Sequence, residues 1–134
     1  METSTPLDLS RIGQVNLPVR DLDRAIAFYR DVLKIRFLFQ VPHLAFFDCG
    51  GLRLLLDASG EETHPRRSSI LYFVVPDLRR STQALRVRGV RIVSEPHLVA
   101  PMPDHDLWMS FFEDSEGNTL ALMSEVRPPQ GPLS

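Results

Sequence analysis

The chain has 134 residues, of which 43% are hydrophobic and 24% charged, and its formal net charge is −2. This size and composition predict one globular domain, and the lack of a basic excess argues against nucleic-acid binding. The single cysteine, Cys49, excludes an internal disulfide and fits a reducing compartment. The sequence has no apolar run as long as a membrane span and no signal-peptide core, so we expect a cytoplasmic protein without a membrane partner.

The first half of the chain is predicted to fold as β-α-β-β-β. Hydrophobic periodicity predicts a strand, a helix and three short strands, at residues 12–19, 22–33, 35–41, 44–49 and 52–56. Asp21 is an N-cap candidate for the helix because it directly precedes the first apolar residue of the helical pattern. Pro42-His43 and Gly50-Gly51 supply turns between the last three strands.

The same pattern restarts after a polar linker. We predict a strand, a helix, a strand and a β-hairpin, at residues 70–75, 78–88, 90–94, 107–112 and 120–123. Asp77 and Gly89 are the expected N-cap and C-cap of this second helix. A proline-rich loop leads into the hairpin, whose turn contains Gly117-Asn118, residues that tolerate the positive φ of short turns.

An internal repeat relates the two halves. Val19-Arg20-Asp21-Leu22 matches Val75-Pro76-Asp77-Leu78, and residues 51–56 match residues 117–122. We therefore predict an α+β fold in which two βαβββ modules form a curved, eight-stranded cup with a helix behind each half. The predicted single domain spans 10–126, with module one at 10–58, a linker at 59–68, module two at 69–126, and loose tails at 1–9 and 127–134.

Two motifs carry a resemblance to a known family. They are Val19-x-Asp21-Leu22-x2-Ala25-x2-Phe28-Tyr29-x3-Leu33 and Phe112-x-Asp114-x2-Gly117-Asn118-x-Leu120-x-Leu122. The sequence resembles the vicinal oxygen chelate (VOC) superfamily, which includes glyoxalase I, bleomycin- and fosfomycin-resistance proteins, extradiol dioxygenases and methylmalonyl-CoA epimerase. The resemblance covers residues 11–125 and implies the fold, but it does not fix the chemistry, because this fold hosts several unrelated activities.

The resemblance also implies where a metal ion would bind. Metallated members of the superfamily place one ligand, usually His, Gln or Glu, on each of four strands that line the cup. Those positions correspond here to Gln14, Leu55, Ile70 and Ala121. Only Gln14 has a donor atom, whereas a catalytic metal needs about three protein ligands. We therefore expect no cofactor; a divalent metal held by Gln14 and unidentified groups is the less favoured alternative.

The cup is the predicted binding site for a small molecule. Its face is mostly apolar with a few polar groups, as is typical of small-molecule sites. A cup filled by its own side chains is the competing interpretation, and Gln14 could simply hydrogen-bond to Asn16 or to the backbone. The predicted ligand-binding residues are Gln14, Asn16, Arg53, Leu55, Ile70, Tyr72, Trp108, Ala121 and Met123.

His105 is a weak candidate for an acid–base group, and no other catalytic residue is indicated. It opens the hairpin next to Asp106, and a neighbouring carboxylate can raise the basicity of an imidazole. Adjacent side chains on a strand point to opposite faces, however, so Asp106 is not expected to orient His105.

Three functions remain open. The favoured hypothesis is a metal-independent homodimer that sequesters a small apolar or aromatic molecule between protomers, resembling the bleomycin-resistance type. The alternative is a glyoxalase-like or epimerase-like lyase or isomerase, either metal-dependent through unidentified ligands or metal-free through His105. The third is a regulatory or scaffold domain whose cup is filled.

Overall fold

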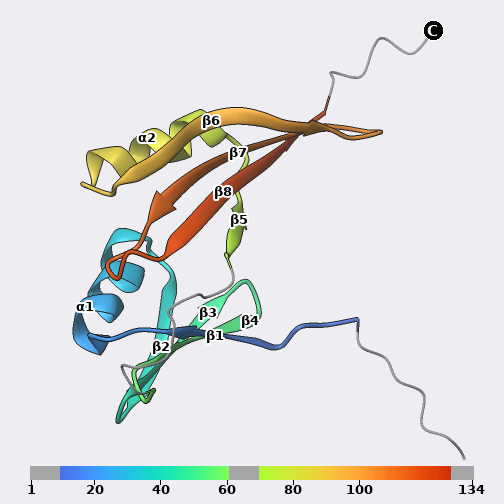
Figure 1. Ribbon diagram of the computed structural model, residues 1–134. Coiled ribbons are helices and arrows are strands. Elements are labelled where there is room, and N and C mark those ends of the chain that lie inside the picture. The colour runs from blue at the N-terminus through green and yellow to red at the C-terminus, as the bar shows by residue number, and fades with distance from the viewer. Residues whose placement is uncertain (1–9, 61–69, 128–134) are drawn as a thin grey trace, which may run out of the picture.

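A computed structural model describes residues 10–60 and 70–127 of the chain (Figure 1). The predicted tail at 1–9, the predicted tail at 127–134 except for its first residue, and the linker from residue 61 onward lie outside the described residues. Within the described residues, no helix is long and apolar enough to cross a membrane.

Module one has the predicted β-α-β-β-β order. Its elements are β1 (Gln14–Pro18), α1 (Leu22–Ala27), a π-helical turn η1 (Phe28–Val32), β2 (Arg36–Val41), β3 (Leu44–Cys49) and β4 (Leu52–Asp57). The sheet order is β1-β4-β3-β2, with β1 parallel to β4. Asp21 caps α1 as predicted, since its carboxylate accepts a hydrogen bond from the backbone N–H of Arg24 at 3.1 Å.

Module two repeats this arrangement. Its elements are β5 (Tyr72–Val74), α2 (Leu78–Val87), β6 (Ile92–Pro101), β7 (Asp106–Glu113) and β8 (Thr119–Val126). The sheet order is β5-β8-β7-β6, and Asp77 caps α2 through the backbone N–H of Arg80. The two βαβββ modules confirm the predicted α+β fold. The eight strands are divided between two separate four-stranded sheets.

The prediction for β6 was wrong. We expected the strand to end at Ser94 or slightly beyond and a proline-rich loop to follow, but β6 continues to Pro101. β6 is the edge strand of its sheet and pairs only with β7, so Pro96 and Pro101 do not interrupt a ladder on both sides. Three register shifts along the β6–β7 pair accommodate the irregular backbone.

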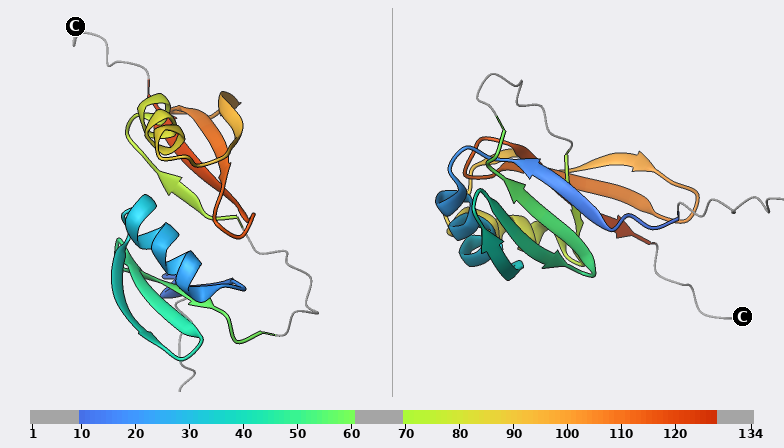
Figure 2. Two further views of the ribbon diagram at one scale, coloured as in Figure 1. Left: turned by 90° about the vertical axis from the view of Figure 1, so that its left-hand side faces the viewer. Right: turned by 90° about the horizontal axis from the view of Figure 1, so that it is seen from below.

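The two modules share one hydrophobic core. Buried residues from module one, including Leu17 and Phe47, belong to the same cluster as Leu85 and Phe112 of module two. Helix α1 lies between the two sheets (Figure 2). Each sheet therefore has a helix face, which packs toward the core, and a second face, which we call its open face. The two open faces do not close over a common space within one chain.

The β7–β8 turn fastens module two onto module one. The Tyr29 hydroxyl donates a hydrogen bond to the buried Asp114 carboxylate at 2.7 Å. Asp114 also accepts hydrogen bonds from the backbone N–H groups of Glu116 and Asn118, both at 2.8 Å, and from the Asn118 side chain at 3.0 Å. Glu116 in turn accepts one from the backbone N–H of Arg20 at 2.6 Å. We call Tyr29, Asp114, Glu116 and Asn118 the clasp.

Candidate ligand-binding site

Three aromatic rings cross the open face of module two. Tyr72 on β5 meets Phe111 on β7 edge to face, with ring centroids 6.4 Å apart. Phe111 also stacks with His97 on β6, at a centroid distance of 6.2 Å. Ring pairs at these separations attract one another. We call Tyr72, Phe111 and His97 the aromatic row.

Ala121 makes the aromatic row possible. The strand register places Ala121 of β8 directly between Tyr72 and Phe111. Its methyl group is small enough for the two rings to meet over it, and Ala121 itself is fully buried. Met123 lies two residues further along the same face of β8 and is half-buried. Ala121, at which the family resemblance implies a metal ligand, is therefore a small apolar side chain beneath the rings of Tyr72 and Phe111.

The open face of module one is more polar. The guanidinium carbon of Arg53 lies 5.8 Å from the centroid of the Phe46 ring, which stacks on Phe39 at 4.6 Å. The Asn16 side chain donates a hydrogen bond to Asp57 at 2.9 Å. Burial raises the pKa of Asp57, but the hydrogen bonds it accepts, including the one from Asn16, outweigh this effect and hold the pKa below its usual range. This face therefore combines aromatic surface with fixed polar groups.

The predicted site residues lie on two separate faces of one chain. The open face of module one carries Gln14, Asn16, Arg53 and Leu55 at adjacent register positions. The open face of module two carries Tyr72, Ala121 and Met123, and Ile70 precedes β5. The polar side chains and Tyr72 are exposed, whereas Leu55 and Ala121 are buried within their sheets. A single chain thus supplies two halves of the predicted cup without closing it.

The prediction that Trp108 lines the cup was wrong. The guanidinium carbon of Arg79, on α2, lies 6.0 Å from the centroid of the Trp108 ring, so the indole is on the helix face of the sheet. Its same-face neighbour Ser110 hydrogen-bonds to Thr82 of α2 at 2.8 Å, and Phe112 is buried in the core. Strand alternation correctly groups Trp108 with Ser110 and Phe112, but both faces of this strand are largely apolar, so alternation alone does not say which one meets the helix.

Sequence reasoning also missed two residues of the aromatic row. Phe111 follows from the alternation of β7 once Trp108 is assigned to the helix face. His97 had no comparable signal, because the prolines around it predicted a loop where the structure has an edge strand.

The open faces do not fit a metal centre. At the four positions implied by the resemblance, Leu55, Ile70 and Ala121 offer only carbon, and Gln14 is the single donor. Across residues 10–60 and 70–127, no three His, Cys, Asp or Glu side chains are grouped closely enough to hold a metal ion. Because a catalytic site needs about three such ligands, we assign no chemical step to a metal.

His105 lies at the far end of the open face of module two. Its Nδ1 is 2.7 Å from Asp104 and its Nε2 is 3.9 Å from Glu125, and its side chain is 11% exposed. The hydrogen bond with His105 lowers the pKa of Asp104. Asp104, not the adjacent Asp106, thus orients the imidazole. Six strand residues, or about 20 Å at ~3.3 Å per residue, separate His105 from Phe111, so it does not reach the aromatic row.

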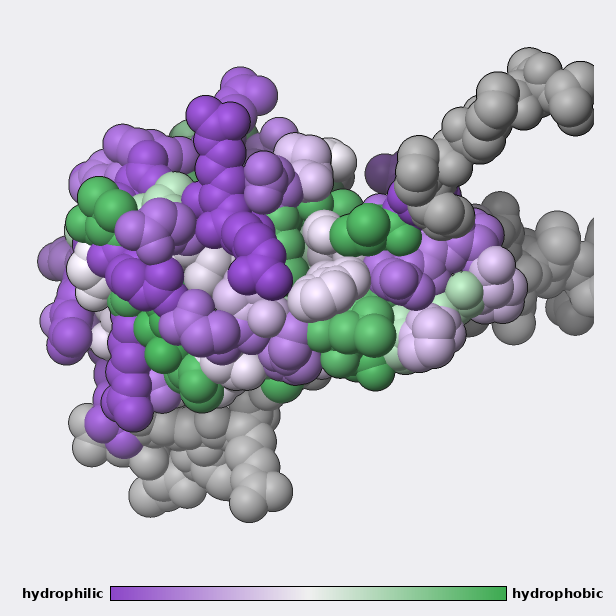
Figure 3. All heavy atoms as spheres, turned by 90° about the horizontal axis from the view of Figure 1, so that it is seen from above, coloured by the Kyte–Doolittle hydropathy of each residue, from purple (hydrophilic) through white to green (hydrophobic). Residues whose placement is uncertain are grey.

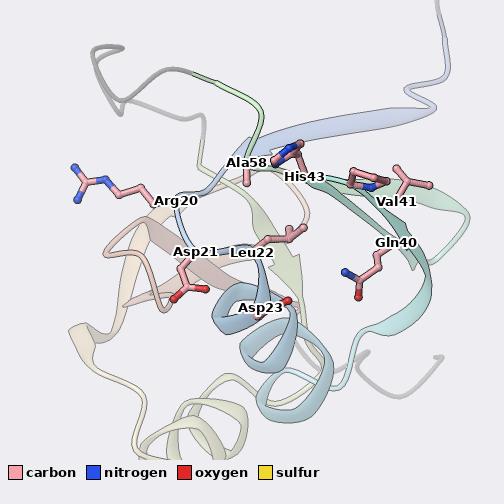
Figure 4. A pocket seen from close by; sticks show the side chains of 9 residues that line it. Arg20, Asp21, Leu22, Asp23, Gln40, Val41, His43 and Ala58 are labelled. Carbon is pink, nitrogen blue, oxygen red and sulfur yellow. The ribbon is translucent and has the colours of Figure 1, made fainter.

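A separate hollow of about 870 Å³ lies between the start of α1 and the β2–β3 turn (Figure 4). Asp21 and Asp23 line it on the helix side, and His43 lies beside Ala58 on the other side. The Asp21 carboxylate is already engaged as the N-cap of α1. Because its titratable groups do not converge, this hollow is a weaker candidate site than the open faces.

Comparison with known proteins identifies the family. A sequence profile of the Glyoxalase/Bleomycin resistance protein/Dioxygenase superfamily matches residues 11–122, and the chain belongs to this superfamily. None of the curated proteins matches the sequence.

Solved structures share the fold. Lactoylglutathione lyase from Agrobacterium tumefaciens is 24% identical, with a TM-score of 0.70 over 87% of this chain and 95% of that chain. TioX from Micromonospora sp. ML1 is 20% identical, with a TM-score of 0.72 over 87% of this chain and 100% of that chain. The integron cassette protein VCH_CASS1 of V. Cholerae is also 20% identical, with a TM-score of 0.72 over 90% and 98% of the two chains. These identities establish the fold and not an activity.

Proposed function

We propose that this protein is a cytoplasmic homodimer that binds a small apolar or aromatic molecule on its open sheet faces without a metal ion. The aromatic row is the observation that carries the proposal. Tyr72 lies at the end of the row, on the edge strand β5, and is 46% exposed, so this end of the row is available to a ligand. A planar ligand ring stacked there would gain about 0.5–1.5 kcal/mol per ring pair beyond its buried area.

The open face of module one supplies the polar part of the proposed site. Arg53 and Asn16 are exposed on that face, and both are held by neighbours, Arg53 against a ring and Asn16 by Asp57. A mostly apolar surface with a few fixed polar groups is the usual composition of a small-molecule site. The polar groups would orient a ligand whose apolar body lies on the aromatic row.

The proposed homodimer brings the two kinds of open face together. Val74 on the short edge strand β5 is 71% exposed, and Phe39 on the edge strand β2 is 48% exposed. On the side of the molecule that carries α2 and β6, hydrophobic side chains form separate patches among mostly hydrophilic ones (Figure 3). Exposed apolar edges of this kind are usually covered by a partner. In the proposed dimer, the open face of module one would lie opposite that of module two in the partner, completing the cup between protomers.

The test is a screen of planar aromatic compounds by thermal unfolding in the presence of EDTA. A compound at a hundredfold excess over its Kd would stabilise the protein by about 2.7 kcal/mol, which raises Tm by several degrees. We expect such a shift to persist in EDTA, near-zero Zn, Ni, Mn and Fe by elemental analysis, and a dimer by light scattering. A screen without any shift, a shift that EDTA abolishes, or a monomer at micromolar concentrations would contradict the proposal.

A lyase or isomerase activity is the second candidate, and the oriented imidazole of His105 is the observation that favours it. Asp104 fixes Nδ1 and leaves Nε2 toward Glu125, an arrangement that suits proton transfer at Nε2. In this case, turnover of a hemithioacetal or an epimerisable acyl substrate would continue in EDTA and be lost in His105→Gln. Activity that survives His105→Gln would exclude this mechanism.

A further inference from the structure

An apolar cavity of about 240 Å³ lies where the end of η1 meets module two. Ile35 borders it from module one, and Phe73, Leu85 and Leu122 border it from module two. Leu85 and Leu122 belong to the shared core, on the helix faces of the sheets. The cavity is therefore separate from the open faces, and what it binds does not depend on the function proposed for them.

The charges at this cavity have one sign. Lys34 and Arg88 are the two charged residues among those that line it, and no carboxylate is among them. Both side chains are exposed, so their charged ends can stay in water while the cavity wall remains mostly apolar, with Ser81 as its one uncharged polar side chain. An apolar wall beside two cations complements a molecule with an apolar body and an anionic head group.

The position of Lys34 is unusual for a lysine. Its φ of 61° lies in the left-handed region, and Gly89 occupies the corresponding place after α2, with a φ of 82°. A side chain at such a φ costs backbone strain that glycine avoids, and strain of this kind clusters at functional sites. Lysine at position 34 therefore lowers the stability of the fold relative to glycine and places a cation at the cavity.

The π-helical turn brings Lys34 to this position. The segment from Asp21, the N-cap of α1, to Lys34 is one residue longer than the segment from Asp77, the N-cap of α2, to Gly89. The extra residue is absorbed in η1, where the backbone N–H of Leu33 donates to the carbonyl of Phe28 at 3.0 Å. Such π turns are rare and are frequent at functional sites. The cavity, the cations and the altered helix end therefore converge on one place.

We infer that this cavity binds a small amphiphilic carboxylate, with its apolar body in the cavity and its carboxylate at Lys34 and Arg88. Its volume of about 240 Å³ is below the ~300 Å³ lower end of drug-sized sites, so the ligand is the size of a medium-chain fatty acid or an arylalkanoic acid. Octanoate is a suitable probe for the fatty acids, and 3-phenylpropanoate is a suitable probe for the arylalkanoic acids.

Isothermal titration calorimetry of the full chain tests the inference. We expect octanoate, 3-phenylpropanoate or both to bind, and octan-1-ol, which lacks the charge, to bind more weakly. Lys34→Asn and Arg88→Gln should each reduce carboxylate affinity about fivefold, the effect of losing one partly exposed ion pair. Ala84 lines the cavity, so Ala84→Leu should fill part of the cavity and reduce affinity further.

Matched controls separate binding from folding. Arg80→Gln removes an exposed cation of α2 outside the cavity and should leave affinity unchanged. Asn tolerates the left-handed region better than Lys, so Lys34→Asn should keep or raise Tm while it weakens binding. Absence of binding by both carboxylates would overturn the inference. Binding that Lys34→Asn, Arg88→Gln and Ala84→Leu all leave unchanged would overturn it equally.

Discussion

The turns after β3 and β7 occupy the same place in the two modules but make different contacts. Asp48, the second-last residue of β3, accepts a hydrogen bond from the backbone N–H of Gly51 in the first turn at 3.1 Å. Asp114 begins the second turn and, in addition to its local partners, accepts a hydrogen bond from Tyr29 of the other module. The repeat places Leu85 where module one has Tyr29, and Leu85 has no donor to offer Asp48. The clasp therefore forms on one side of the molecule only.

The open faces and the helix ends differ in the same way. Module two presents an aromatic row over Ala121, whereas module one presents Arg53 and Asn16. The residue with positive φ after α2 is Gly89, whereas the one after η1 is Lys34. The repeated positions that build the scaffold are alike in both modules. The positions at which the modules differ are those that we assign to module assembly and ligand binding.

The largest effect is expected at the two equivalent aspartates. Asp114→Ala leaves the buried Tyr29 hydroxyl and two partly buried backbone N–H groups without their acceptor, so we expect it to lower the free energy of unfolding by about 4 kcal/mol. Asp48→Ala removes a local turn contact and should cost about 1 kcal/mol. Urea unfolding of both variants measures the difference, and equal losses would show that the clasp does not hold the modules together.

The next contrast is in stability, between the helix face and the open face of the module-two sheet. Trp108→Ala removes an indole packed against α2 and should cost about 3 kcal/mol in the free energy of unfolding. Tyr72→Ala removes a side chain that is 46% exposed and should cost less than about 1 kcal/mol. Thermal unfolding of both variants tests this ranking, and a larger loss for Tyr72→Ala would reverse the assignment of the faces.

Alkaline pH should weaken the clasp. Burial, and then the charge and hydrogen bond of Asp114, raise the pKa of Tyr29 far above its ordinary value of 10.0. Above about pH 10 the unfolded chain releases a proton that folded Tyr29 keeps, so the free energy of unfolding falls by up to about 1.4 kcal/mol per pH unit. Below pH 10 this contribution is constant.

Urea unfolding between pH 9 and pH 11 measures this slope. Tyr29→Phe should reduce it, and Tyr72→Phe should retain it. The same slope in both variants would mean that Tyr29 is not the group responsible.

The smallest effect concerns Cys49, the last residue of β3. Burial, and then the charge of Asp48, raise the pKa of the thiol. Because the thiolate is the reactive form, Cys49 should react with a disulfide reagent at pH 8 more slowly than free cysteine. Asp48→Asn should speed the reaction by removing the negative charge. A reaction as fast as that of free cysteine would show that the thiol is more accessible than its position at the end of β3 implies.

The fold was predictable because local pattern and repeat agree. Asp21 and Asp77 cap their helices as expected, and the βαβββ order follows from hydrophobic periodicity. The length of β6 was not predictable, since Pro96 and Pro101 are compatible with a strand only at a sheet edge, and the sequence does not reveal which strand is at the edge.

The site was predictable only in part. Alternation assigns Tyr72, Ala121 and Met123 to one side of their strands, but both sides of β7 are largely apolar, and Trp108 was assigned to the wrong one. The role of Asn118 also needed the structure. Gly117 has the expected positive φ of 80°, whereas the side chain of Asn118 hydrogen-bonds to Asp114 instead. A side-chain hydrogen bond of this kind leaves no periodic signal in the sequence.

The most direct test of the account is a fluorescence titration with N-phenyl-1-naphthylamine, a neutral aromatic probe, in EDTA. It compares the wild-type protein with Tyr72→Ala and Trp108→Phe, which change opposite faces of the same sheet. We predict saturable binding that Tyr72→Ala weakens about tenfold, a loss of ~1.4 kcal/mol, and that Trp108→Phe leaves unchanged. Equal affinity in the wild type and Tyr72→Ala, or no saturable binding at all, would contradict a ligand site on the open face.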